Sequence, residues 1–97
     1  MHFEWDDDKH RENVRKHGFD FVDAWKVFEA PMFTELDDRE DYGEDRWIGI
    51  GLLDARVVVI VFTERGEDTI RVISLRKALT HEREKYEQTL RDRLGSH

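Results

Sequence analysis

The sequence VVVIVFT at residues 57–63 constrains the fold more than any other part of the chain. β-Branched and aromatic side chains follow one another there without alternation, which is typical of a strand buried on both faces. Turn-like segments flank this run, with LDAR before it and ERGED after it. The pattern therefore predicts a central strand with neighbouring strands over residues 46–53 and 69–75.

The N-terminal segment carries the signals of a short strand followed by a helix. Residues 2–5 alternate between polar and apolar side chains and fit an edge strand. Asp6 is a predicted N-cap, because its carboxylate can accept a backbone N–H of the first turn. The helix is expected to end at Lys16 or His17, where Gly18 supplies a residue suited to a left-handed C-terminal cap.

Two further helices are predicted. One begins at Asp20 and ends before Pro31. Its apolar residues fall at i, i+3, i+4 and i+7, namely Phe21, Ala24, Trp25 and Phe28. The last helix begins at a Thr80 N-cap and continues to about Leu94, with a thin apolar face at Tyr86, Leu90 and Leu94.

The front half of FTELDDREDYGED, residues 33–45, provides a further strand. The predicted order is β-α-α-β-β-β-β-α, an α+β fold with two N-terminal helices and one C-terminal helix on a small antiparallel β-meander. The length of 97 residues predicts a single domain, residues 1–97.

Composition excludes several classes of protein. The chain has no cysteine, and its five histidines lack any metal-ligand spacing, so we expect neither a metal site nor a cofactor. No apolar run approaches the roughly 20 residues that cross a bilayer. The N-terminus MHFEWDDDK has no signal-peptide pattern, so we expect a cytoplasmic protein with no membrane contact.

Negative charge is concentrated in one segment. The net charge is -7, and residues 31–45 hold seven acids against one base. This balance argues against strong non-specific binding to nucleic acid but leaves room for a local cationic pocket, because salt screens charges beyond about 8–10 Å. Residues 35–45 are either a solvated loop or a docking surface for a basic partner.

Four arginines of the predicted meander lie near strand ends: Arg46, Arg65, Arg71 and Arg76. Their planar guanidinium forks match phosphate if they converge at one edge of the sheet. The alternative is that Arg65 pairs with Glu64 or Asp68, and Arg71 with an acid on a neighbouring strand. Both interpretations are open from the sequence.

The tripeptide KHG at residues 16–18 has a similar pair of interpretations. Histidine exchanges protons near neutral pH, and lysine can hold an anion. The alternative role of Lys16, His17 and Gly18 is to end a helix, where cations are favoured by the exposed carbonyls.

An ordered set of motifs resembles the BrnT family of bacterial type II toxins. The match extends from about residue 3 to residue 87. It comprises FEWD at 3–6, Lys9, Asn13, KHG at 16–18, Phe21, Ala24, VF at 27–28, Pro31, ExR at 44–46, IG at 48–49, VFTER at 61–65, IRVIS at 70–74, Arg76, Ala78, ER at 82–83 and YE at 86–87.

The resemblance implies a RelE-like ribonuclease fold that cleaves RNA and inhibits translation. It also implies neutralisation by a BrnA-like antitoxin with a ribbon-helix-helix domain, through which alone the complex meets operator DNA. It favours the functional interpretations of the arginines and of KHG over the structural ones.

The resulting hypothesis is a metal-independent endoribonuclease in which the RNA 2′-OH attacks the adjacent phosphate. Arg65 and Arg76 stabilise the developing negative charge, with Arg71 and Arg46 as secondary clamps.

The remaining predicted roles concern proton transfer and RNA binding. His17 or Lys16 transfers protons. Arg83 and Tyr86 present their faces to RNA from the last helix, with base stacking or core packing as the two roles open to Tyr86.

One position departs from the family pattern. Ser74-Leu75-Arg76 stands where the family usually has Ser-Ala-Arg. If Leu75 faces substrate, cleavage is altered or lost; if it faces the core, the change is a repacking. The alternative function is a non-catalytic binding module that acts as corepressor with a DNA-binding antitoxin.

Overall fold

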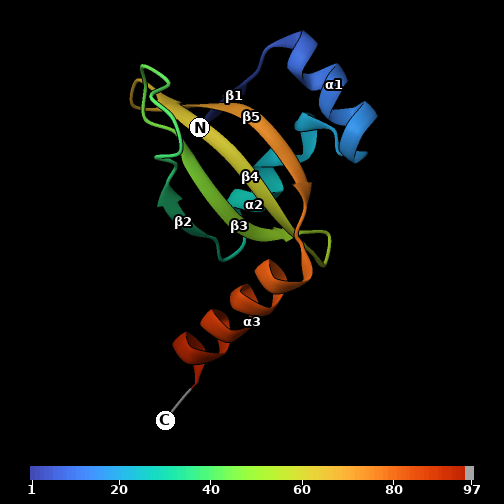
Figure 1. Ribbon diagram of the computed structural model, residues 1–97, viewed down its shortest axis with the longest axis vertical. Helices are drawn as coiled ribbons and strands as arrows, with labels where there is room; N and C mark the ends of the chain where they lie inside the picture. Colours follow the sequence, from blue (N-terminus) through green and yellow to red (C-terminus); the bar gives the residue numbers. More distant parts are fainter. Residues whose placement is uncertain (96–97) are drawn as a thin grey trace.

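The computed structural model describes residues 1–95. Over these residues the chain forms an α+β fold, in which helices flank a five-stranded sheet of order β1-β5-β4-β3-β2 (Figure 1). The elements follow one another as predicted. They are β1 His2–Glu4, α1 Asp7–His17, the 3-10 turn η1 Phe21–Asp23, α2 Ala24–Phe28, β2 Phe33–Leu36, β3 Trp47–Leu53, β4 Arg56–Arg65, β5 Thr69–Lys77 and α3 Thr80–Leu94.

The sheet is mixed: the predicted antiparallel meander is present, and β1 adds a strand in the parallel direction, which the prediction did not include. Strands β2 to β5 do form an antiparallel meander, but β1 runs parallel to β5, with His2 beside Thr69 and Glu4 beside Arg71. The chain leaves β1 through the helices and re-enters the sheet at the opposite edge with β2. Alternation within a three-residue strand identifies a strand but carries no information on the direction of its partner.

Strand β4 is central, as the VVVIVFT run predicts. Val58, Ile60 and Phe62 point into the core beneath α1, η1 and α2, whereas Val57 and Val59 point towards α3. These five side chains are buried. The next residue on the α3 side, Val61, is only half-buried, which marks a part of the sheet that α3 leaves uncovered.

Helix α1 is capped as predicted and locked to the edge of β5. The Asp6 carboxylate accepts the Lys9 N–H at 3.0 Å, and Gly18 ends the helix with φ 76°. The buried Asn13 amide pairs with the backbone of Leu75 as a neighbouring strand would. Its Nδ2 donates to the Leu75 carbonyl at 2.8 Å, and its Oδ1 accepts the Leu75 N–H at 3.0 Å.

The second predicted helix is divided into η1 and the five-residue α2. Ala24 and Val27 are buried, but Trp25, which the apolar stripe places in the core, is 47% exposed. A 3-10 helix has three residues per turn, whereas the apolar stripe was counted at 3.6 residues per turn. The stripe therefore does not continue from η1 into α2.

Helix α3 begins at Thr80, one residue earlier than an N-cap at Thr80 requires. The cap position is Leu79, whose N–H donates to the Glu82 carboxylate at 2.8 Å. The helix extends away from the body of the molecule (Figure 1), and Leu94 near its end is 80% exposed. Among the described residues, no helix is long and apolar enough to cross a membrane.

Candidate functional site

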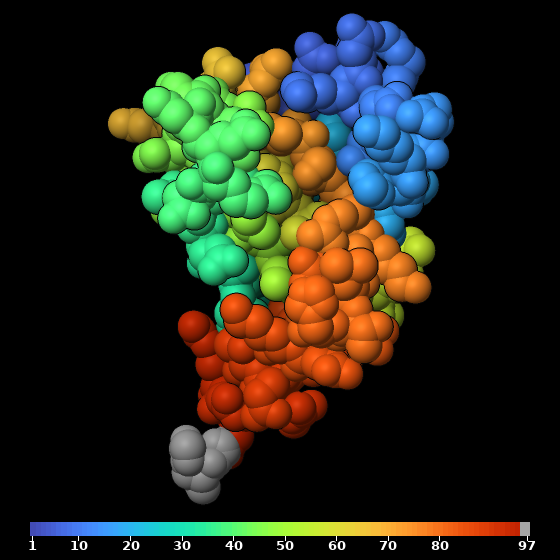
Figure 2. Space-filling model, in the orientation of Figure 1, coloured from blue at the N-terminus to red at the C-terminus, as the bar shows by residue number. Residues whose placement is uncertain are grey.

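One face of the sheet is only partly covered. Helices α1 and α2 cover the closed face, whereas α3 packs on the other face near the β3–β4 turn. Beyond α3, half-buried Ile48, Val61 and Ser74 pair side by side across β3, β4 and β5. Figure 2 shows this floor as a hollow between the green loop of residues 37–46 and the orange segment that leads into α3. We call this uncovered surface the open face.

Arg71 lies on β5 opposite Thr63 of β4 and beside Glu4 of β1. Its Nη1 is 2.7 Å from the Glu4 carboxylate. The predicted pairing of Arg71 with an acid on a neighbouring strand is therefore confirmed. The contact holds the guanidinium across the sheet, and the side chain remains 31% exposed.

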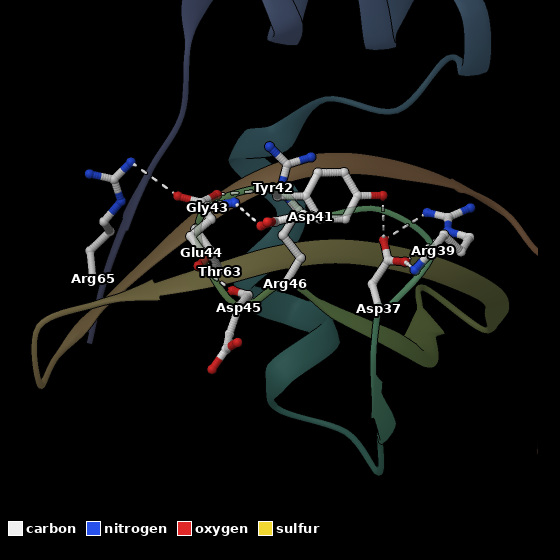
Figure 3. Close-up of polar contacts among 10 residues, drawn as sticks. All are labelled: Asp37, Arg39, Asp41, Tyr42, Gly43, Glu44, Asp45, Arg46, Thr63 and Arg65. Atoms are coloured by element: carbon white, nitrogen blue, oxygen red, sulfur yellow. Dashed lines mark hydrogen bonds and ion pairs between the residues drawn. The ribbon is translucent and has the colours of Figure 1, made fainter.

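Arg46 and Arg65 share one carboxylate, that of Glu44 (Figure 3). Glu44 lies 3.3 Å from Arg46 Nε and 3.8 Å from Arg65 Nη2. The Arg46 guanidinium also stacks 4.1 Å from the centre of the Tyr42 ring. Arg65 thus pairs with a loop residue distant in sequence rather than with Glu64 or Asp68, the acids that the sequence offers nearby.

The same loop holds Arg39, which the sequence analysis missed. The buried carboxylate of Asp37 accepts Arg39 Nε and Nη2 at 2.8 Å each, and the Tyr42 hydroxyl donates to it at 3.3 Å. These hydrogen bonds, above all those from Arg39, lower the pKa of Asp37 to about 2. Tyr42 therefore links the Asp37–Arg39 pair to the Arg46–Glu44 pair, as Figure 3 shows.

Arg76 lies at the other end of the open face, where β5 leads into α3. Its Nη1 and Nη2 donate to the Glu82 carboxylate at 2.8 and 2.9 Å. The hydrogen bond from Arg76 lowers the pKa of Glu82 to about 2, opposed by burial and assisted by the Leu79 N–H. Glu82 therefore both caps α3 and fixes the Arg76 guanidinium.

Lys16 and His17 are exposed at the end of α1. Together with Ile73 and Ser74 they line a shallow cavity of about 190 Å³ along the edge of β5. Gly18 has the left-handed cap conformation, so the structural interpretation of KHG holds as well. Ser74 lines this cavity and also belongs to the floor of the open face, which makes the two regions neighbours.

The two predicted residues of α3 lie in different environments. Arg83 is exposed in the first turn of the helix. Tyr86 is buried, 2% exposed, and its hydroxyl donates to the Pro31 carbonyl at 2.8 Å. A ring enclosed in this way has no free face for a base, so the structure favours core packing for Tyr86.

Leu75 is fully buried in the closed-face core and bonded through its backbone to Asn13. The bulkier side chain at this position is therefore a repacking of the core.

The open face combines fixed guanidinium groups with free hydrogen-bond capacity. Each predicted arginine of the sheet has a carboxylate neighbour. Of the five N–H donors of a guanidinium, the carboxylate takes two in Arg76, one each in Arg46 and Arg71, and none within hydrogen-bond distance in Arg65. Within residues 1–95 no group of three potential ligands lies close enough to hold a metal ion. The arrangement is suited to binding phosphate through arginine.

Comparison with known proteins identifies the family. Residues 5–82 match the ribonuclease toxin BrnT of type II toxin–antitoxin systems. The fold is similar to the 1.1 Å crystal structure of the Brucella abortus ribonuclease toxin BrnT, with a TM-score of 0.65 and 28% identity over 82% of this chain and 99% of that one. No curated protein sequence matches the chain. Because the family match covers most of the chain, this protein belongs to the BrnT family of ribonuclease toxins.

Proposed function

We propose that the chain, as a single RelE-like domain, is an endoribonuclease that cleaves RNA without a metal. The observation that carries the proposal is the set of guanidinium groups held by carboxylates around an uncovered sheet face. Arg65 and Arg76 would stabilise the charge that develops on the phosphate, and Arg46 and Arg71 would clamp the neighbouring backbone.

The reaction uses a nucleophile that RNA itself supplies. The 2′-oxygen forms a bond to the adjacent phosphorus as the bond to the 5′-oxygen breaks, so the products end in 2′,3′-cyclic phosphate and 5′-hydroxyl. His17 or Lys16 would take the proton of the 2′-OH or return one to the 5′-oxygen, from a cavity that shares Ser74 with the open face.

Other contacts of the proposal come from α3 and from partners. Arg83 would bind RNA backbone from the first turn of α3, whereas buried Tyr86 is left out of the RNA-binding set. Membership of a type II toxin–antitoxin family implies an antitoxin. We propose a BrnA-like ribbon-helix-helix antitoxin that alone contacts operator DNA, and cleavage of cellular RNA, with inhibition of translation, in the cytoplasm.

The decisive experiment is incubation of purified, antitoxin-free protein with end-labelled RNA in EDTA. We expect fragments with 2′,3′-cyclic phosphate and 5′-hydroxyl ends. Arg65→Ala and Arg76→Ala should each slow cleavage about 100- to 1000-fold, and His17→Ala about 100-fold or more. If all three variants cut like the wild type, the site is elsewhere; if folded wild-type protein leaves RNA intact, the enzymatic proposal fails.

A second candidate function is a non-catalytic corepressor. It is favoured by the net charge of -7 and by the pairing of the sheet arginines with acids, which leaves little free positive charge. Expression without the antitoxin discriminates the two functions. An RNA-cleaving toxin arrests growth, whereas a corepressor does not.

A further inference from the structure

The loop of residues 37–46 is rich in acidic residues, yet it places the guanidinium of Arg39 at the open face. Phe33 of β2 packs against the side of the sheet that carries α3. Because strand side chains alternate, Glu35 and Asp37 lie on that same side. The Asp37 N–H donates to the Arg46 carbonyl at 2.7 Å, so the strand pairing extends to Asp37. The Asp37 side chain is therefore at the rim of the open face.

Asp37 is built as a support for Arg39. Only 1% of its side chain is exposed, and it accepts the Arg39 backbone N–H at 3.2 Å in addition to the two side-chain donors. Arg39 itself is 67% exposed. Two of its five N–H groups are used by the fork, so the others are available to a ligand while the group is held in one orientation.

Arg76 lies on β5, at the end of the open face where the chain leads into α3. It is held by Glu82 as Arg39 is held by Asp37. The Glu82 hydrogen bonds raise the pKa of Arg76, and the positive charge of Arg39 acts in the opposite direction. Both guanidiniums belong to the open face, and each is held by a carboxylate.

We propose that Arg39 binds the phosphate backbone of RNA at the rim of the open face, with Asp37 as its positioning residue. The inference rests on the proposed function and adds to it a contact that the sequence analysis did not assign. The acidic loop then has two roles: its carboxylates keep the net charge negative, and its Arg39 takes part in the site.

Binding of an RNA that cannot be cleaved tests the role of Arg39. In a fully 2′-O-methylated RNA oligonucleotide the attacking hydroxyl is blocked, so fluorescence anisotropy reports binding alone. Arg39→Ala should weaken binding about 10-fold and reduce the slope of log affinity against log salt by about 0.7. Arg11→Ala is the matched control: Arg11 is exposed and paired with Asp8 on α1. It should change affinity by no more than about twofold.

A second pair of variants tests the positioning role. Asp37→Asn and Asp38→Asn remove the same charge from neighbouring residues, one buried and one exposed. If only bulk charge matters, both variants bind RNA more tightly. If Asp37 positions Arg39, only Asp38→Asn binds RNA more tightly, and Asp37→Asn binds RNA more weakly although it has lost a negative charge. Arg39→Lys, at an exposed site that tolerates substitution, keeps the charge without the fork and should bind with intermediate affinity.

The outcomes separate the inference from the proposed function. Wild-type RNA binding with an unchanged Arg39→Ala variant overturns the inference and leaves the proposed function standing. Failure of the wild-type protein to bind or cleave any RNA overturns the proposed function and the inference with it. Unchanged RNA binding together with weakened antitoxin binding by Arg39→Ala would assign Arg39 to a carboxylate of the antitoxin, which also overturns the inference.

Discussion

The two faces of the sheet are made from alternate residues of the same strands, but different forces hold them. On the closed face, Phe21, Ile60 and Leu75 are fully buried in one apolar cluster beneath the helices. On the open face, Arg71 and Arg76 are about one-third exposed and are held by carboxylates. The closed face therefore supplies most of the stability, because burial of apolar area is the dominant favourable term in folding.

This contrast indicates the role of the ion pairs on the open face. Exposed ion pairs contribute about 0–1 kcal/mol each to folding, so the ion pairs of the open face, apart from the partly buried Arg76–Glu82 pair, add little to the stability that the core provides. Their effect is to limit the orientations of guanidinium groups before a ligand arrives. Substitutions on the closed face should therefore change the stability of the fold, and substitutions on the open face should change RNA binding and cleavage.

The largest expected effect breaks the closed face. Leu75→Ala should destabilise the fold by about 2–5 kcal/mol in urea unfolding, because the cavity lies in a fully packed core. Cleavage per folded molecule should be unchanged. The neighbour on the opposite face provides the control, and Ser74→Ala should cost less than about 1 kcal/mol. Lost cleavage at unchanged stability would place Leu75 at the substrate.

Arg65→Ala, on the open face, should have the opposite effect: it should reduce cleavage and leave stability unchanged. The ion pair with Glu44 at 3.8 Å is loose and half-exposed, so the melting temperature should hardly change. Cleavage of RNA in EDTA should fall about 100- to 1000-fold. Arg11→Ala, with its exposed Asp8 partner, should leave both quantities as they are. A large loss of stability in Arg65→Ala would show that the ion pairs do more than orient side chains.

Glu82 is where the two faces meet, because it caps α3 and holds Arg76. Its pKa is lowered from 4.5 to about 2, and its side chain is 18% exposed. A depressed carboxylate stabilises the fold above its ordinary pKa, and that contribution is lost as the pH falls towards 2. Glu82→Gln should therefore cost about 1.5–3 kcal/mol at pH 7, with the difference from wild type shrinking between pH 4.5 and 2.

Urea unfolding across this pH range measures the effect of Glu82. The matched background is Arg76→Ala, in which the largest cause of the lowered pKa is absent. There the cost of Glu82→Gln should depend much less on pH. An equal pH dependence in both backgrounds would attribute it to the Leu79 cap alone.

Features that depend on neighbours in sequence were predictable. The VVVIVFT run gives β4, and Asp6 and Gly18 bound α1, because caps and strand periodicity act over a few residues. The direction of β1 was not predictable, nor was the exposure of Trp25, since both depend on how distant segments meet.

The candidate site divides in the same way. Residue type marked Arg65 and Arg71 as cations near strand ends, but their partners were identified only in part. Arg71 has the cross-strand acid that pairing rules predict, whereas Arg65 finds Glu44 through the folding of the acidic loop. Arg39 was missed because the sequence analysis considered only the total charge of residues 31–45, in which a single base is hidden among seven acids. The available signal was its spacing of two residues from Asp37, which allows the two side chains to form an ion pair.

The smallest expected effect lies outside both faces, in the turn between β3 and β4. Asp54 and Ala55 have φ of 49° and 70°, the left-handed region that costs an ordinary residue about 1–2 kcal/mol. Ala55→Gly should raise stability by about 0.5–1 kcal/mol after the added freedom of the unfolded chain is counted. Asp54→Gly should gain less, since aspartate tolerates this conformation better. RNA cleavage should be unaffected in both variants; a change would mean that the hairpin end of the sheet is coupled to the open face.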